Sequence, residues 1–393
     1  MNKTNLKNTI IIGGGASALM CALVASQNGT NVTILEAGNK VGKKILVSGN
    51  GRCNFTNKNF SHNCYNQNIT KYLKQFNNEN TTELFNKLGL ESYYDEEGRF
   101  YPVSNLSSSV LDVILNKLEK QNCEIITQTK VEVINVNSNG YELVTNNGNY
   151  TAQNVVLCCG GNALGNMIEH LGVKTKPFVP SLCALKTSEY TKTLSGIRLS
   201  GAEVKLVVNG KEYTECGEVL FKDEGLSGIC IMNLSAHLAR QNNYNAQILI
   251  NLCPNLTKQQ LVNKLLTRKE NLFTDKLSKF FVGFTHKSVG LELLKRAGLN
   301  ENNKVGSLSL EQINKLACVL QELKFNVVGT YDNNQVFSGG IELGELTENL
   351  ELKKHKNFYV CGEACDVDGL CGGYNLQWAW TSGKIVGEKL KND

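Results

Sequence analysis

A glycine-rich segment near the amino terminus has the residue types and spacing that bind a pyrophosphate. Gly13-Gly14-Gly15-Ala16-Ser17-Ala18 has the form GxGxxA, and Glu36 follows 18 residues after Ala18. Gly13 permits a tight turn, and Gly15 lets the backbone approach a pyrophosphate. Glu36 can accept hydrogen bonds from ribose hydroxyls, and its charge would repel a 2′-phosphate. The segment therefore predicts a dinucleotide site that disfavours NADP.

The flanking residues supply the elements that such a turn requires. Residues 9–12 are all β-branched and predict a buried parallel strand. Residues 19–26 predict a helix, and residues 32–35 predict a second strand that ends at Glu36. The helix N-terminus would bind the pyrophosphate through its free N–H groups and its dipole. Strand, glycine turn, helix, strand and acid in this order indicate a Rossmann-type unit, but they do not distinguish FAD from NAD.

A second glycine-rich loop follows the acid. Residues 42–57 include Lys43, Lys44 and Arg52, which could lie near the phosphates of an extended dinucleotide. Cys53 suggests a redox nucleophile, but no second cysteine stands at CxxC spacing. A packed thiol, or one that lies near a cofactor, is the favoured interpretation.

The C-terminal segment favours FAD over NAD. Residues 358–361 predict a strand that ends at Gly362-Glu363, and a helix is expected after Gly372-Gly373. Many FAD folds use such an acid to accept a ribityl hydroxyl, and they direct such a helix N-terminus at the flavin N1/O2 edge. Three cysteines in this segment lack a nearby fourth ligand, so a metal site is not expected there. A disulfide is not expected either. Trp378 and Trp380 point in different directions on the helix, so at most one faces a flavin.

The whole chain resembles the BaiN-like family of NAD(P)/FAD-dependent oxidoreductases, also described as aminoacetone-oxidase-like flavoproteins. The segments that carry the resemblance run in the family's order from end to end: Ile12–Ala16, Gly42–Lys44, Ser48–Asn54, Gly98–Ser104, Gly225–Gly228 and Asp366–Trp380. Two departures stand out. The stretch after Val155–Gly161 is short, and Lys222-Asp223-Glu224 replaces the family's Thr-His, so no histidine role transfers to this site.

The resemblance and the element pattern predict an α/β fold with a discontinuous Rossmann-type FAD-binding domain. Its first part is residues 1–180 and its second part is residues 338–393. The expected insertions are a β-rich domain at 181–255, which returns at 324–337, and a small helical domain at 256–323. Strands are expected at 125–136, 141–151, 155–159, 182–187, 201–208, 211–222, 247–250, 325–330 and 335–337, and an amphipathic helix at 107–120.

The predicted FAD-binding residues come from the glycine loops, the strand ends and the two helix starts. Val131 is included because the family resemblance places its backbone near adenine. No metal site is expected. The set is Gly13, Gly15, Ala16, Ser17, Glu36, Lys43, Lys44, Gly51, Arg52, Cys53, Val131, Gly160, Gly362, Glu363, Gly373, Asn375 and Leu376.

No hydrolytic triad, HExxH or Walker pattern is present, and the five histidines are scattered. The reactive group is therefore expected to be the cofactor. Our hypothesis is that NAD(P)H, bound transiently, reduces FAD, which then transfers hydride to an electron-poor C=C bond. Tyr374 could donate the proton and Arg99 could polarise a carbonyl. Each has a structural alternative, since Arg99 could form an ion pair and Tyr374 could pack at the helix start.

The resemblance leaves the substrate open. It implies a small-molecule enone or ribosomal RNA as the partner in a reductase, through ene reduction or dihydrouridine formation. The alternatives are an O2-dependent amine oxidase that makes H2O2 and a flavin-binding factor without enzymatic activity.

Composition sets wider limits. The chain has 393 residues, a net charge of +5 that looks spread along the chain, and 14 cysteines without regular spacing. These values exclude a disordered, collagen-like or coiled-coil chain and indicate reduced thiols in a cytoplasmic protein. The uncharged stretch between Lys7 and Glu36 resembles a targeting segment, but glycines and a polar turn divide it into pieces too short to span a bilayer. The oligomeric state is not indicated.

Overall fold

The computed structural model describes residues 6–59, 61–121, 123–332 and 336–390. The chain divides into two compact units, residues 1–179 with 335–393 and residues 180–334. Within the described ranges, none of the helices combines the length and the apolar character needed to cross a bilayer.

The first unit is built on a seven-stranded sheet in the order β6-β2-β1-β9-β8-β7, with β18 also paired to β9. In register, Ile12 lies opposite both Leu35 and Leu157, so the carboxyl ends of β1, β2 and β9 meet at one edge of the sheet. β6 and β18 join this parallel set, whereas β7 and β8 are antiparallel. The strands are β1 (Leu6–Ile12), β2 (Val32–Leu35), β6 (Cys123–Ile126), β7 (Val131–Asn137), β8 (Gly140–Thr145), β9 (Gly148–Leu157) and β18 (Phe358–Val360).

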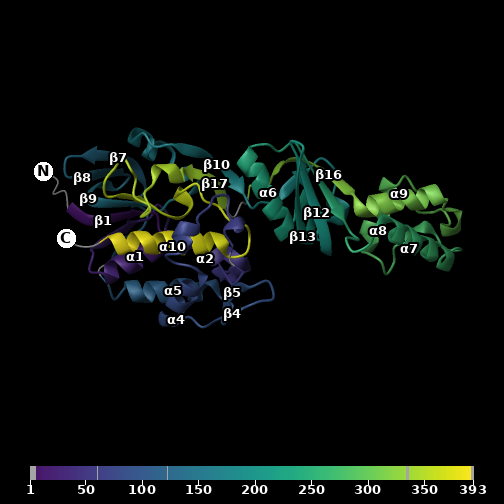
Figure 1. The fold of residues 1–393 in the computed structure, drawn as a ribbon, viewed down its shortest axis with the longest axis horizontal. Coiled ribbons are helices and arrows are strands. Elements are labelled where there is room, and N and C mark those ends of the chain that lie inside the picture. Colours follow the sequence, from purple (N-terminus) through teal and green to yellow (C-terminus); the bar gives the residue numbers. More distant parts are fainter. Residues whose placement is uncertain (1–5, 60, 122, 333–335, 391–393) are drawn as a thin grey trace. The chain divides into compact units, whose positions relative to one another are not determined.

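Helices α1 (Ala16–Gln27) and α10 (Tyr374–Lys389) pack side by side in the first unit (Figure 1). Two glycines of α10 permit the close approach. A Cβ at Gly383 would lie 2.4 Å from the Ser17 carbonyl oxygen, and one at Gly387 would lie 2.8 Å from the Cys21 carbonyl oxygen. The two helices pack together although they lie near opposite ends of the sequence.

Smaller elements complete the first unit. Strands β3 (Thr56–Asn57), β5 (Arg99–Pro102) and β4 (Ser92–Tyr94) form a three-stranded sheet in that order. The paired strands β10 (Thr175–Ser181) and β17 (Val336–Ile341) lie where the chain leaves and re-enters this unit. The remaining helices are α2 (Lys43–Val47), α3 (Thr70–Leu73), α4 (Asn78–Lys87) and α5 (Ser107–Leu118).

The second unit contains a closed barrel in the order β11-β14-β13-β12-β15-β16. Alternate residues of its strands point inward, and Val204, Leu206 and Ile248 are fully buried. The barrel strands are β11 (Leu185–Thr187), β12 (Arg198–Val208), β13 (Lys211–Lys222), β14 (Gly225–Ser227), β15 (Ala246–Asn251) and β16 (Leu323–Thr330). The helices are α6 (Ile229–Gln241), α7 (Lys258–Asn271), α8 (Lys287–Arg296) and α9 (Leu310–Gln321).

The predicted fold class, a Rossmann-type α/β domain with a β-rich insertion and helices, is confirmed. Several expected strands differ. The strand expected at 141–151 is divided by a turn into β8 and the start of β9, and the strand expected at 155–159 is the end of β9, which stops at Leu157. The strand expected at 125–136 is two strands, β6 and β7, because the chain turns at Gln128, whose φ is +55°. Residue 335 of the strand expected at 335–337 lies outside the described residues, and β17 continues to Ile341.

Candidate cofactor site

Glu36 joins the loops that follow β1 and β2. One carboxylate oxygen accepts the Gly14 N–H at 2.6 Å and the other accepts the Gly38 N–H at 2.6 Å. The carboxylate is therefore fixed beside the glycine-rich turn, at the edge where the parallel strands end. This is the position that recognition of a ribose requires.

The first turn of α1 presents free backbone donors. Gly15 is the N-cap residue and makes no side-chain capping bond, and the first bond within the helix runs from Leu19 N to Gly15 O at 3.0 Å. The N–H groups of Ala16 and Ser17 therefore have no acceptor within the helix. A Cβ at Gly15 would have no atom within 4 Å among the described residues, so space is open in front of the turn. An anion such as a pyrophosphate fits there.

The predicted adenine segment runs beside Glu36. The Glu36 N–H donates to Ile126 O at 2.9 Å, and the Thr129 N–H donates back to Glu36 O at 2.9 Å. The Gln128 N–H donates to Gly38 O at 2.8 Å. Val131, two residues beyond Thr129, is buried at the start of β7.

Lys44, Glu363 and Gly160 come together from three separate segments. The Lys44 Nζ lies 2.5 Å from Glu363 Oε2, and Glu363 Oε1 accepts the Phe337 N–H at 2.6 Å. A Cβ at Gly160 would lie 2.4 Å from Glu363 Oε2. The predicted ribityl acceptor thus already holds two donors, and a carboxylate has further lone pairs for a hydroxyl.

The loop from Gly49 to Cys53 has an unusual backbone. Asn50 and Cys53 have φ of +55° and +59°, a conformation that non-glycine residues rarely adopt, and Gly51 has φ of +81°. The Arg52 guanidinium lies over the Tyr101 ring, 4.4 Å from its centroid. Lys43 is exposed.

Cys53 is fully buried, and burial raises the pKa of its thiol to about 12. A thiol with this pKa is neutral near pH 7, whereas a nucleophilic cysteine requires an accessible thiolate. The geometry therefore favours a packed thiol over a redox nucleophile.

The N-terminus of α10 is a second uncapped helix start. Gly373 is its N-cap, with φ of +94° and no side-chain capping bond, and the first bond within the helix runs from Gln377 N to Gly373 O at 2.9 Å. The Asn375 side chain donates to Gly369 O and accepts the Gly369 N–H, both at 2.8 Å, so it fixes the preceding loop. Leu376 is half-buried against the core.

Asn54 was not predicted as a site residue. Only 9% of it is exposed, and its Oδ1 is buried with no hydrogen-bond partner among the described residues. A Cβ at Gly373 would lie 2.7 Å from this oxygen, so the orphaned acceptor lies against the uncapped start of α10. An unsatisfied buried acceptor costs about 1–3 kcal/mol. A ligand that brings an N–H donor to this helix end, as a flavin ring does, fits the site.

The two predicted catalytic residues have structural partners. The Tyr374 hydroxyl donates to Asn59 O at 3.1 Å, and burial raises the pKa of Tyr374. The Arg99 guanidinium pairs with Asp95 at 2.7 Å and with Glu97 at 2.8 Å. These contacts match the structural alternatives, and the catalytic roles stay predictions.

Two buried carboxylates near α10 were also missed. Asp366 accepts the Lys176 ammonium of β10 at 2.6 Å and is 2% exposed. Asp368 accepts the Ser338 hydroxyl of β17 at 3.0 Å and is 1% exposed. The loop before α10 therefore bonds to both β10 and β17, the strands where the chain leaves and re-enters the first unit. The sequence signal was the pair of acids within Asp366–Trp380, but it did not indicate their partners.

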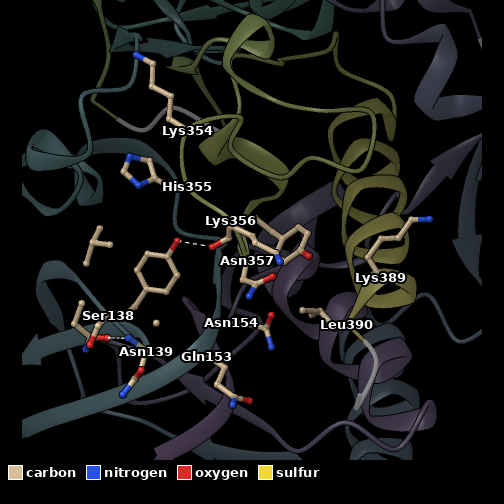
Figure 2. Close-up of a pocket in the computed structure, with 15 residues that line it drawn as sticks. Ser138, Asn139, Gln153, Asn154, Lys354, His355, Lys356, Asn357, Lys389 and Leu390 are labelled. Carbon is tan, nitrogen blue, oxygen red and sulfur yellow. Dashed lines mark hydrogen bonds between the residues drawn. The ribbon is translucent and has the colours of Figure 1, made fainter.

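A hollow of about 740 Å³ lies at the other end of α10. Lys354 and Lys356, which precede β18, and Lys389, at the end of α10, line it (Figure 2). A helix of 16 residues is about 24 Å long. This hollow is therefore separate from the site at the helix N-terminus.

Known proteins resemble this chain over nearly its whole length. It is 31% identical to a 3-dehydro-bile acid delta(4,6)-reductase of Clostridium scindens, over 96% of this chain and 97% of the relative. It is 27% identical to a ribosomal RNA dihydrouridine synthase of Escherichia coli, over 98% of both chains. A solved 3-ketosteroid-delta4-(5alpha)-dehydrogenase from Rhodococcus jostii RHA1 has a similar fold, with a TM-score of 0.50 and 11% identity over 100% of this chain and 98% of that one.

The family model described as the HI0933-like protein Rossmann domain matches residues 7–389. That range covers both parts of the Rossmann-type domain and the whole second unit between them. The resemblance seen in the sequence is therefore confirmed, and the chain belongs to the HI0933-like family.

Proposed function

We propose that this protein binds FAD in its first unit and is a reductase that saturates a C=C bond conjugated to a carbonyl, with NAD(P)H as the electron donor. The observation that carries the proposal is the pair of uncapped helix starts, α1 and α10, one beside Glu36 and the other beside the orphaned Asn54 oxygen. One suits a pyrophosphate and ribose, and the other suits a flavin ring.

Different residues of the chain would bind different parts of FAD. The N–H groups at the start of α1 would hold the pyrophosphate, and Glu36 would accept the adenosine ribose hydroxyls. Glu363 would accept a ribityl hydroxyl while it keeps Lys44 and the Phe337 N–H. The dipole at the start of α10 would stabilise negative charge near N1/O2, and Asn54 would accept an N–H. Bound FAD would supply the hydride chemistry.

The names of the relatives support this reaction class. A delta(4,6)-reductase and a dihydrouridine synthase share the saturation of a C=C bond. The substrate of this chain is thus either a small-molecule enone or a uracil-type base in RNA. Tyr374 and Arg99 are the proposed proton donor and carbonyl-polarising group, although each would have to leave a present partner. A cytoplasmic location is also proposed, because the 14 cysteines have no regular spacing in the sequence.

Anaerobic reduction tests the proposal. The purified protein should carry FAD in a one-to-one ratio, and NADH or NADPH should bleach its visible absorbance in the absence of oxygen. The reduced protein should regain colour when a conjugated enone or a uridine-containing RNA is added. A protein that cannot be reconstituted with FAD would refute the proposal. H2O2 formation from amines without NAD(P)H would support the oxidase alternative instead.

A further inference from the structure

One segment of the second unit has a clear excess of positive charge. Residues 256–321, which contain α7, α8 and α9, have eleven Lys and Arg against five Asp and Glu, a net charge of +6, whereas the whole chain carries +5. The rest of the chain sums to −1 but is uneven, because residues 1–78 have nine Lys and Arg against one Glu, a net charge of +8. The charge is therefore distributed unevenly along the chain, and residues 256–321 are one of two segments with a positive excess.

Most of this charge faces solvent without a partner. Among the described residues of this segment, only Lys279 and Arg296 lie within 4.0 Å of a carboxylate, at 3.1 Å from Asp275 and 2.8 Å from Glu292. A surface with this excess of unpaired cations creates a positive potential that attracts polyanions. The exposed lysines are Lys258, Lys264, Lys276, Lys279, Lys287, Lys295, Lys304 and Lys315.

Two of these lysines are held directly opposite one another. Lys276 and Lys304 form an antiparallel β-bridge. The hydrogen bonds from Leu277 N to Asn303 O and from Val305 N to Asp275 O, both 2.8 Å, flank the bridge. Like charges directly opposite on paired strands are destabilising. A bound anion would convert this repulsion into attraction.

An exposed aromatic ring lies beside this lysine pair. Phe273 is 58% exposed, yet its backbone carbonyl accepts the Gly306 N–H at 2.9 Å. Its ring covers Gly306 so closely that a Cβ there would lie 2.8 Å from two ring carbons. The ring is therefore fixed against the backbone while much of it stays open to solvent. We name Phe273, Lys276 and Lys304 the Phe273 patch.

We propose that the Phe273 patch binds single-stranded RNA. Its lysines would contact two phosphates, and its ring would stack on a base. The apolar faces of α7, α8 and α9 are already buried in the unit, since Leu261, Leu293 and Leu316 are 0% exposed. Among the large apolar residues of these helices only Leu310 is strongly exposed, at 60%, so they have no apolar stripe for insertion into an anionic membrane. The inference goes beyond the proposed function because it requires neither the flavin nor a reaction.

Fluorescence anisotropy with the full-length protein tests the patch. The probe is a labelled oligouridine longer than the about 4–16 nucleotides of a typical single-strand site. The double variant Lys276→Glu/Lys304→Glu should raise Kd at least about tenfold and lower the salt dependence of binding. Phe273→Ala should raise Kd about tenfold, because the base loses the ring on which it stacks.

The matched control changes the same charge elsewhere in the second unit. Lys192 and Lys211 are exposed and lie outside residues 256–321, so Lys192→Glu/Lys211→Glu should bind RNA nearly as tightly as the wild type. Equal binding by both double variants and the wild type would overturn the proposal. Binding to vesicles rich in phosphatidylserine with none to RNA would also overturn it.

Two readouts separate this proposal from the proposed function. Thermal unfolding should show that each variant keeps its fold, and anaerobic NAD(P)H reduction should be unchanged in all of them. RNA binding is measured on both the flavin-loaded and the flavin-free protein. A failure of nucleotide reduction would therefore count against the reductase alone.

Discussion

The Lys44 ammonium lies 2.5 Å from the Glu363 carboxylate, and this ion pair joins residues 319 positions apart in the sequence. The other Glu363 oxygen accepts the Phe337 N–H at 2.6 Å. One carboxylate therefore connects α2, the end of β18 and β17. The two bonds should contribute differently to stability. The Lys44 side chain is 58% exposed, so solvent screens its ion pair with Glu363.

This difference predicts unequal effects of two Glu363 variants on the apoprotein. Glu363→Gln loses only a solvent-screened ion pair, so its free energy of unfolding should fall by less than about 1 kcal/mol. Glu363→Ala also leaves the Phe337 N–H without an acceptor and should lose about 1–3 kcal/mol more. Urea denaturation measures both. Equal stability losses would contradict the assignment of the two bonds.

Gly15→Asp should abolish FAD binding. The new carboxylate would occupy the open space before α1 and place an anion where a pyrophosphate must bind. Flavin content after purification measures the effect. Gly344→Asp is the control, because a Cβ at Gly344 would also have no neighbour within 4 Å in the part of the chain that the structure describes, and Gly344 lies outside the predicted site. Stoichiometric flavin in the Gly15 variant would count against the site.

Asn54→Ala should weaken FAD binding without lowering the stability of the apoprotein. Removal of an unpartnered buried acceptor should leave the Tm of the apoprotein unchanged or raise it, whereas FAD affinity should fall about tenfold or more. Differential scanning fluorimetry with and without FAD measures both quantities. Asn375→Ala is the comparison, because it breaks bonds to Gly369 and should lower the Tm of both forms. An Asn54 variant that binds FAD normally would refute this role.

Cys53 predicts a specific alkaline destabilisation. The pKa of its thiol is raised from 9.0 to about 12 by burial, so the neutral form is favoured in the folded state. The stability that this shift contributes is complete below pH 9 and is lost as the pH rises towards 12. The free energy of unfolding should therefore fall less steeply with pH in Cys53→Ala than in the wild type. If the free energy of unfolding falls equally with pH in the variant and in the wild type, the folded state does not favour the neutral Cys53 thiol.

The same burial predicts slow chemical labelling. Iodoacetamide should modify the exposed Cys216 and Cys318 in the native protein at neutral pH, and Cys53 only after denaturation. Mass spectrometry of tryptic peptides identifies the modified residues. Rapid native modification of Cys53 would restore the nucleophile hypothesis.

Local sequence patterns predicted several elements at their observed bounds. The β-branched run at Val32–Leu35 and the alternating run at Lys211–Lys222 match β2 and β13. The glycine motif predicted a helix directly after it, although α1 starts at Ala16 rather than at residue 19. The family and fold class followed from these motifs and their order.

Features that depend on distant partners were not predictable in this way. The split between β6 and β7 depends on bonds from Gln128 and Thr129 to the loop after β2. Barrel closure depends on the pairing of Leu185 with Thr330. The orphaned Asn54 oxygen results from the meeting of two segments more than 300 residues apart. The exact domain boundaries, the nicotinamide donor and the catalytic residues stay predictions.

The packing of α10 on α1 also sets the order in which the protein can fold during synthesis. A ribosome makes all of the second unit before it makes α10, because residues 180–334 precede Tyr374 in the chain. Domains generally fold as units as they emerge. The barrel can therefore form first, while the face of α1 around Ser17 and Cys21 remains uncovered. Until α10 is made, the nascent nucleotide-binding half exposes the apolar surface that α10 later covers.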